Sequence, residues 1–580
     1  MSDSFTPKLG RIGWKSGTRL DRYINRVMRA AQAAGHMGGT GNGRFNGAHI
    51  GRGSAFGTLA GAGLYAGGQR RVVVKARISK LKRGDLGAAR AHLRYIQRDG
   101  VTPDGEPGQL YGRDIDEANG TEFLDACDGD RHQFRLIVSA EDATELADLR
   151  PFIRDLMQKA EADLGTRLDW VAVDHFNTGH PHTHIVIRGK DDRGEDLIIA
   201  RDYMSHGFRM RARELVTLEL GPEIESDMTL KLAREVEAER FTRLDRALLD
   251  HTKRGFLAIS TMPPAERQIH AAHMGRLRKL EQMGLVREFQ TGVWEIPTEI
   301  EGKLKSIGSR GDIIKTMHRA LREAGIERPA GSFSLFDPMK PNARIVGRVA
   351  GIGLTDEIND RHYVVIDGTD GKVHYADLGH LPPELVPERG MIAAIDAPTG
   401  SEDQKPRTRL RILSYLSLEK LVAAEGATWI DKQLLNRKPE QFINHGFGAE
   451  ARGALARRRQ WLLSQGLAQL TPDDAFRPVP GMLDQLRQRD LRQASVALSK
   501  QLGLAYVEPR EGEQISVTYK LAVHLASGRF AVFQMEKEFV LVPWQPGLEN
   551  LRGRRVLGYR TSDSFEWNRP RARQVGLSLS

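Results

Sequence analysis

The chain contains a single cysteine, Cys127, and no run of eighteen apolar residues. One cysteine cannot build a disulfide framework or a cysteine-based zinc site, so both are excluded. The lack of a long apolar run argues against a membrane-spanning helix, and the first residues, rich in glycine and arginine, do not resemble a signal peptide. We therefore expect a protein that is cytoplasmic when synthesised and has no membrane span.

At 580 residues the chain is too long for one hydrophobic core, and we expect three to five domains. The formal net charge is +11, which favours a polyanionic partner, although a merely soluble basic protein is the alternative. Residues 1–70 hold ten Lys and Arg against two acidic residues and are rich in glycine. We predict that this segment is a disordered basic arm, which binds nucleic acid, is bound by another protein, or is only solvated.

The next part of the chain alternates strand and helix patterns. Residues 71–80 and 133–142 are rich in β-branched and apolar residues and predict strands, as do residues 168–176 and 182–189. Helices are expected over residues 86–98, between Asp85 as N-cap and Gly100 as stop, and over residues 143–164. This order favours an α+β domain, residues 71–235, in which helices cover a mostly antiparallel sheet.

Four of the eighteen histidines lie between His175 and His184. Residues two apart in a strand share a face, so His182 and His184 point the same way. If the two strands form a hairpin, His175 lies across from them, and three imidazoles then suit a divalent metal with open positions. His180 lies in the turn as a fourth ligand, a proton carrier or neither. The alternative is three histidines on a solvated sheet face.

The helix over residues 86–98 carries a candidate nucleophile, Tyr95. Helical spacing places Tyr95 nearly opposite the apolar face, beside small and basic residues. A phenol titrates near pH 10, so it needs a metal-polarised electrophile or a nearby base to attack at neutral pH. An ordinary surface tyrosine is the alternative. The expected buried face consists of Leu86, Ala89, Leu93 and Ile96.

Three stretches together resemble a known family. "HFNTGHPHTHIVIRG", from His175 to Gly189, resembles the third motif of conjugative relaxases, mobilisation nucleases of the His-hydrophobe-His endonuclease superfamily that include the T-DNA border nucleases. "AHLRYIQRDG" is similar to their first motif, which carries the nicking tyrosine, here Tyr95. "FRLIVSAED" is similar to the strand of their second motif, with Ser139 in the polar position. The resemblance covers about residues 70–220.

The resemblance implies a mechanism. A divalent ion, Mg²⁺ or Mn²⁺ with Zn²⁺ as the alternative, would be bound by His175, His182 and His184 and would polarise a scissile phosphate of single-stranded DNA. Tyr95 would attack the phosphorus, giving a 5′-phosphotyrosyl DNA and a free 3′-hydroxyl. Because the covalent bond conserves the phosphodiester energy, the strand can be rejoined.

The sequence departs from the family at Asn177, where relaxases often have an aspartate that orients an imidazole. Asp174 could substitute, but strand alternation points it away from His175. The general base is therefore unassigned, with Asn177, His180 and Ser139 as base or accessory candidates. Four arginines are predicted to contact DNA, with a solvated helix face as the alternative for the last three: Arg98, Arg209, Arg211 and Arg213.

The C-terminal half shows one pattern twice. Residues 274–297 and 455–480 each read as a helix, a glycine stop, a strand, a turn and a strand, and they align at an offset of 182. The matched residues are Leu280 with Leu462, Gly284 with Gly466, Leu285 with Leu467, and Trp294 with Phe476. An internal duplication is the interpretation, and a coincidence of domain type is the alternative.

We predict four further modules from this pattern. Residues 240–335 and 415–500 would form winged-helix-like modules, which bind duplex DNA through a helix in the major groove or serve only as protein contacts. Residues 340–400 and 505–565 would form small β-barrel-like modules. Neither β module offers a ligand cluster, and the absence of a phosphate-binding glycine-rich loop leaves no helicase or primase signature.

The leading prediction is therefore a relaxase that nicks a transfer origin and starts conjugative transfer of a plasmid or integrative element. A rolling-circle initiator or transposase of the same superfamily, a metal phosphodiesterase using water, and a non-enzymatic winged-helix DNA-binding regulator are the alternatives. The resemblance implies as partners single-stranded and duplex DNA at the origin, accessory origin-binding proteins and a type IV coupling protein. It also implies passage with the DNA into a recipient cell.

Overall fold

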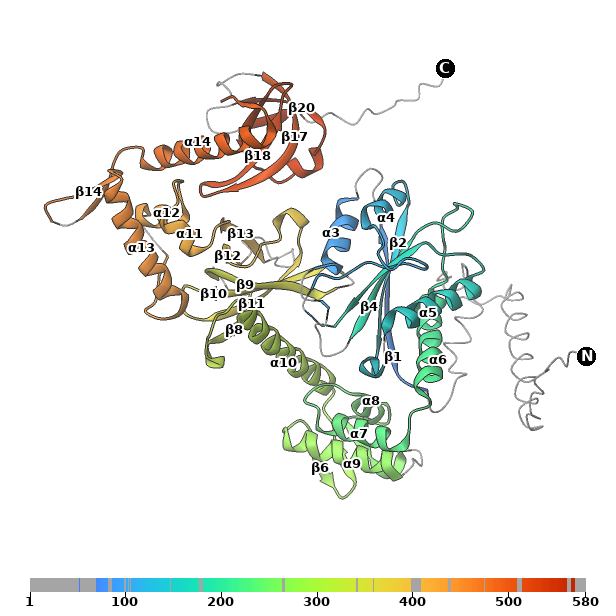
Figure 1. Ribbon diagram of the computed structural model, residues 1–580. Helices are drawn as coiled ribbons and strands as arrows, with labels where there is room; N and C mark the ends of the chain where they lie inside the picture. The colour runs from blue at the N-terminus through green and yellow to red at the C-terminus, as the bar shows by residue number, and fades with distance from the viewer. Residues whose placement is uncertain are drawn as a thin grey trace, which may run out of the picture. The chain divides into compact units, whose positions relative to one another are not determined.

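The computed structural model describes residues 52, 69–81, 86–98, 101–102, 104, 106–146, 148–176, 181–262, 267–340, 343–357, 359–397, 408–436, 440–473, 475–508, 514–560 and 565–568. Of the predicted basic arm, only Arg52, Gln69 and Arg70 are among them. The chain forms two compact units, Met1–Glu237 with Met262–Gln282, and Ala238–Thr261 with Met283–Ser580 (Figure 1). Within the described parts, no helix combines the length and the apolar composition needed to cross a membrane.

The fold mixes helices with mainly antiparallel sheets, which confirms the predicted α+β class. The first unit contains a four-stranded sheet with the order β1-β2-β4-β3, and every neighbouring pair is antiparallel. The four strands lie where the alternating apolar residues predict them. They are β1 Val72–Lys80, β2 His132–Ala140, β3 Trp170–His175 and β4 His182–Arg188.

Helices cover both faces of this sheet (Figure 1). On one face, α5 (Leu149–Leu164) and α6 (Phe208–Leu220) pack against Leu136, Ala172 and Ile185 in a first core. On the other face, α3 (Gly87–Ile96) and α4 (Gly120–Ala126) pack against three valines of β3 and β4 in a second core. The valines are Val171, Val173 and Val186.

The sequence pattern did not predict α4. Its N-cap is Asn119, whose side chain accepts hydrogen bonds from the backbone of Thr121 and Glu122, which is the usual way in which a short polar residue starts a helix. The long helix predicted over residues 143–164 is instead a 3₁₀ turn, Ala143–Glu145, followed by α5. Asp148 starts α5 by accepting a hydrogen bond from the Arg150 backbone.

The remaining helices of the first unit follow the sheet. A short π-helical turn, Tyr203–Gly207, leads into α6, and then come α7 (Glu225–Glu237) and α9 (Arg267–Gln282). Gly275 of α9 faces α7 closely, since a Cβ at this position would lie 3.2 Å from Val236 Cγ1. The Arg276 guanidinium also donates a hydrogen bond to the Val236 carbonyl. These contacts fasten α7 along α9.

The second unit contains two successive sets of elements. The first set is α8 Arg243–Asp250, β5 Phe256–Ala258, η3 Ile259–Thr261, β6 Arg287–Gln290, β7 Val293–Glu295, α10 Ile300–Glu323, η4 Ala330–Ser332, β8 Phe333–Leu335, β9 Arg344–Asp356, β10 Arg361–Gly368, β11 Val373–His380, η5 Pro383–Leu385, β12 Ile392–Asp396 and β13 Arg409–Ser414. The second set is α11 Leu418–Val422, α12 Trp429–Leu435, α13 Gly446–Ser464, β14 Ala468–Leu470, β15 Phe476–Pro478, α14 Met482–Leu502, β16 Ala505–Tyr506, β17 Gln514–Leu525, β18 Gly528–Gln534, β19 Glu538–Pro543, η6 Leu548–Leu551, β20 Arg555–Arg560 and β21 Phe565–Asn568.

The two sets share one topology. The first six-stranded sheet has the order β13-β12-β9-β10-β11-β8 and the second has the order β21-β20-β17-β18-β19-β16. In each sheet the short edge strand, β8 or β16, pairs in parallel, and all other neighbours pair antiparallel. Among the described residues, no pairing closes either sheet into a barrel, so these β modules are open sheets.

Buried residues recur at the offset of 182. Arg276 and Arg458 are both fully buried, in α9 and α13. The glycines that end these helices, Gly284 and Gly466, have φ values of 69° and 68°, in the left-handed region that favours glycine. Trp294 is buried in β7, whereas its counterpart in β15 is only half-buried. The module boundaries predicted for this half stay predictions.

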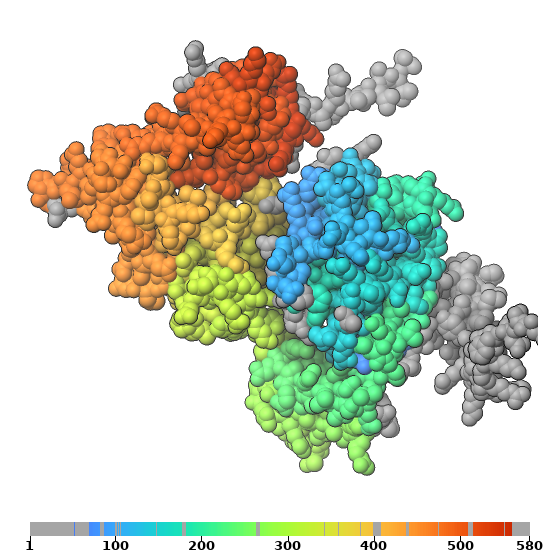
Figure 2. Space-filling model, in the orientation of Figure 1, coloured from blue at the N-terminus to red at the C-terminus, as the bar shows by residue number. Residues whose placement is uncertain are grey.

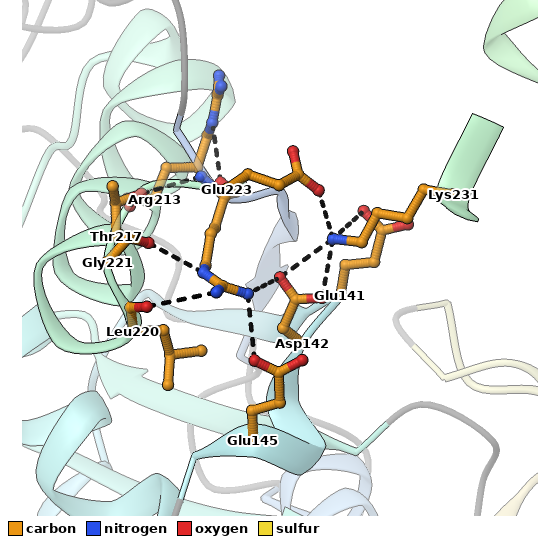
Figure 3. A network of polar contacts seen from close by, with 10 residues as sticks. Glu141, Asp142, Glu145, Arg213, Thr217, Leu220, Gly221, Glu223 and Lys231 are labelled. Carbon is orange, nitrogen blue, oxygen red and sulfur yellow. Dashed lines mark hydrogen bonds and ion pairs between the residues drawn. The ribbon is translucent and has the colours of Figure 1, made fainter. Parts of the chain in front are cut away.

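A polar network fastens the entry of β1 to the segment between α6 and α7 (Figure 3). The Arg70 guanidinium contacts Asp142 at 2.8 Å and also donates to the Gly221 carbonyl. Lys231 Nζ lies 2.8 Å from the other Asp142 oxygen and 2.6 Å from Glu223. Burial raises the pKa of Asp142, but hydrogen bonds from Lys231 and Arg70 outweigh it and hold the pKa below its usual value.

We expect Asp142→Asn to lower the free energy of unfolding by about 2 kcal/mol at pH 7, because it leaves the buried Arg70 and the half-buried Lys231 without their shared carboxylate. The contribution of a carboxylate with a lowered pKa is present above its ordinary pKa of about 4 and is lost as the pH falls through the folded-state value. The difference in the free energy of unfolding between the wild type and Asp142→Asn should therefore decrease below about pH 4. Calorimetric unfolding between pH 3 and pH 7 measures it.

Glu141→Gln is the matched control, since Glu141 lies 3.9 Å from Lys231 and is more exposed than Asp142. Glu141→Gln should lower the free energy of unfolding by less than about 0.5 kcal/mol. Equal losses for the two variants would contradict the central position of Asp142 in this network.

Candidate metal centre

The β3–β4 hairpin brings three histidines together. His175 pairs directly with His182, and Val173 pairs with His184. Directly paired residues and residues two apart share one face of a sheet, so all three imidazoles leave the hairpin on the same side. This register is the one that the strand alternation predicts.

The three imidazoles are buried and close. The ring centroid of His175 lies 5.2 Å from that of His182 and 4.4 Å from that of His184, and the centroids of His182 and His184 are 5.1 Å apart. One ring nitrogen of each residue lies within 4.8 Å of the others. Such a spacing of three nitrogen donors could hold one divalent ion and leave coordination positions open for a substrate.

His175 is oriented by the end of α3. Its Nε2 lies 2.6 Å from the Ile96 carbonyl oxygen, so Nε2 carries the proton and donates it. Its Nδ1 is buried and has no hydrogen-bond partner among the described residues, which fits a nitrogen kept for a metal. Burial, with help from His184 and Arg98, lowers the pKa of His175 to about 2. The ring is therefore neutral at physiological pH, as a metal ligand must be.

Tyr95 lies one residue before the carbonyl that accepts from His175. Three of the four residues predicted for the buried face of α3 are buried, and the fourth, Leu86, is half-buried. The prediction that Tyr95 is held away from the core is wrong, because its ring is half-buried against the edge of the second core. The Arg98 guanidinium lies 4.1 Å from the ring centroid and donates to the Tyr95 carbonyl. This cation–π contact places a positive charge beside the phenol.

The accessory candidates fall into two groups. Ser139 Oγ donates to the Pro181 carbonyl at 3.1 Å, so it fixes the start of β4 just before His182. Asn177 and His180 lie outside the described residues, and their roles stay predictions.

Asp174 points away from the histidines, as alternation predicts. Its Oδ1 accepts hydrogen bonds from Tyr111 Oη at 2.9 Å and from Thr183 Oγ1 at 2.6 Å. Burial raises the pKa of Asp174, although these two hydrogen bonds oppose the shift. The carboxyl therefore ties β4 to the chain around Tyr111 from the far side of the sheet.

The histidine face continues onto two basic side chains that the sequence analysis missed. Lys75 pairs with Ile137, and Ile137 pairs with His184, so the three residues form one row across the sheet. Lys75 is exposed, and Arg77 lies two residues further along the same face of β1. The second core covers β3 and β4 but includes no residue of β1. The alternation in "VVVKARISK" is the signal that could have placed these cations on the polar face.

The arginines of α6 lie on the other side of the sheet, since α6 packs into the first core. Arg211 binds Asp163 at 2.7 Å and also Glu214, Arg213 donates to the Arg70 carbonyl, and Arg209 donates to a backbone carbonyl of the preceding turn. These contacts account for the three side chains within the fold. That they bind DNA stays a prediction.

Cys127 is fully buried in the second core. Burial, with the nearby carboxylate of Asp130, raises the pKa of its thiol to about 12. A thiol that stays protonated is neither a nucleophile nor a metal ligand.

Comparisons with known proteins bear on the second half of the chain. A family model described as "Protein of unknown function (DUF3363)" matches residues 273–408 and 399–576. The histidine cluster and Tyr95 lie before both matched segments. No curated protein and no solved structure matches the chain.

We expect His182→Ala to weaken binding of Mn²⁺ to the full chain by at least about tenfold, since it removes one of three ligands. Isothermal titration calorimetry measures the affinity. Two variants serve as controls and should bind as the wild type does. His270→Ala removes an exposed histidine of α9, and Asp174→Asn keeps an acceptor for Tyr111 and Thr183. Unchanged affinity in His182→Ala would remove the metal site.

Proposed function

We propose the activity of this chain from its histidine site, since the chain belongs to the DUF3363 family of proteins of unknown function. The segments that match this family span more than half of the 580 residues. We propose that residues 71–235 form a metal-dependent nuclease that nicks one strand of DNA by tyrosine transesterification. The nick would lie at a transfer origin and would start conjugative transfer.

One observation carries the proposal: the hydrogen bond of 2.6 Å between His175 Nε2 and the Ile96 carbonyl. It joins the imidazole cluster to the turn of α3 that carries Tyr95, although the two residues are far apart in the sequence. Three imidazoles, with a tyrosine and the Arg98 guanidinium at the end of α3, supply the kinds of group that phosphoryl transfer needs: metal ligands, a nucleophile and a cation for the phosphate.

The chain's residues would divide the reaction among them. Tyr95 Oη forms a bond to the phosphorus while the bond from phosphorus to the 3′ oxygen breaks. The phenol proton passes to solvent, and the leaving 3′ oxygen takes up a proton to become a hydroxyl. Arg98 stabilises the phosphate charge. A divalent ion held by His175, His182 and His184 would withdraw negative charge from the same phosphate.

The strand would reach this site over the open half of the sheet. Lys75 lies in the same row as His184 and is exposed, and the second core includes no residue of β1. A cation on this path attracts the phosphate backbone without reading its sequence. Origin-binding proteins and a type IV coupling protein would act as further partners, and the protein would pass with the bound strand into a recipient cell.

Tyr95→Phe should reduce covalent attachment of protein to DNA by at least about 1,000-fold, because it removes the attacking oxygen. The assay mixes the full chain with Mn²⁺ and an end-labelled single-stranded oligonucleotide that spans the element's transfer origin. A denaturing gel then detects label that moves with the protein. Tyr375→Phe, which removes a hydroxyl from β11, is the control and should leave the adduct unchanged.

The outcomes separate the candidate activities. An adduct that requires Tyr95 and His182 supports the transesterase. An adduct that persists in Tyr95→Phe overturns the nucleophile. Metal-dependent cleavage without any adduct would favour a hydrolase that uses water.

Lys75→Ala should weaken binding of the full chain to single-stranded DNA about threefold. It should also reduce the slope of log affinity against log salt concentration by about 0.7, the value for one phosphate contact. Fluorescence anisotropy at several salt concentrations measures both quantities. Lys80→Ala is the matched control, because Lys80 is exposed on the same strand and points to the opposite face. Equal effects of the two variants would contradict the proposed path.

A further inference from the structure

Helix α13 presents an uncovered face to solvent. Its buried side faces the core through residues that include Phe447, Ala454 and Leu462. Figure 2 shows the segment that contains α13 and β14, in orange, at the molecular surface. The exposed positions along the middle of the helix are Arg452, Ala456, Arg457 and Gln460.

This exposed face has a definite chemistry. It combines two arginines and a glutamine with small residues and contains no acidic side chain. Neither Arg452 nor Arg457 makes an ion pair with any described residue. An Arg457 Nη1 atom lies 3.5 Å from the Cβ position of Gly453, so its guanidinium lies along the surface of its own helix. Small residues allow the helix axis to approach a partner closely.

The first copy of the repeat differs at the corresponding positions. Arg457 aligns with Gly275 of α9, which lies against Val236 of α7. The adjacent Arg276 donates to the Val236 carbonyl. A helix of the chain therefore lies against α9 at Gly275, whereas Arg457 is exposed on α13, although Arg458 makes the matching bond to the Val422 carbonyl of α11. The two copies share one topology but do not present the same surface.

We infer that the exposed face of α13 binds the major groove of duplex DNA. A helix of about 12 Å diameter fits this groove, arginine binds phosphates or guanine edges, and glutamine binds adenine edges. Residues 446–502 carry nine Lys and Arg against five acidic residues, which favours a polyanion such as DNA over a basic or neutral surface. Asp473 is exposed at the tip of the β14–β15 hairpin, and its negative charge repels phosphates. We therefore expect the helix, and not this tip, to contact the DNA. The inference does not rest on the proposed nicking reaction.

The test measures binding of the full chain to a mixed-sequence duplex of about three helical turns, or 30 base pairs, by fluorescence anisotropy over a range of salt concentrations. The double variant Arg452→Ala/Arg457→Ala should raise the dissociation constant at least about tenfold and reduce the log–log salt slope by nearly two. Both positions are exposed and helical, where alanine is well tolerated.

The matched control removes the same charge from exposed helical positions elsewhere, as Arg278→Ala/Arg492→Ala. It should bind as the wild type does. If the wild type does not bind the duplex, or if the two double variants lose equal affinity, the inference is overturned. Covalent attachment to single-stranded DNA should be unchanged in Arg452→Ala/Arg457→Ala, so a failure here is distinct from a failure of the nuclease proposal.

Discussion

The pairing register of β3 with β4 is the constraint on which the candidate site depends. With His175 opposite His182 and Val173 opposite His184, all three imidazoles emerge on one face. A slip of one residue would send His182 and His184 to the opposite face and break up the cluster. Within the hairpin the Thr183 hydroxyl donates to Asp174, and from outside it Tyr111 donates to Asp174 and Ser139 donates to the Pro181 carbonyl.

The two faces of this sheet differ in how completely helices cover them. One face is closed by α5 and α6 over an apolar core, which supplies stability. The other is covered by α3 and α4 only over β3 and β4. His175 is buried on the covered side and is neutral, whereas Lys75 on the β1 side is exposed. A buried cluster and an exposed cation thus lie on one face of the sheet.

The second unit shows how one topology can serve two surfaces. Its two six-stranded sheets repeat the same strand order and the same parallel edge pair, and the helices before them repeat a buried arginine. The copies differ at one aligned position: Gly275 of α9 lies against Val236 of α7, whereas Arg457 of α13 is exposed. A buried arginine that satisfies backbone carbonyls, as Arg458 does for three of them, is tied to the fold, so the exposed positions are the ones left to vary.

The sequence by itself determined the local elements and their chemistry: the four strands of the first sheet, the alternation that aligns His182 with His184, the α3 helix and the repeat at an offset of 182. These depend on periodicity and on turn residues a few positions apart, which a single sequence contains. Only the tertiary structure decided that the Ile96 carbonyl accepts a hydrogen bond from His175 and that Lys75 shares a row with His184. The same holds for the packing of Tyr95 against the second core and for the position of α6 on the face of the sheet opposite the histidines. Each of these depends on packing or pairing between segments distant in the chain, and no local pattern encodes which distant segments meet or in which layer.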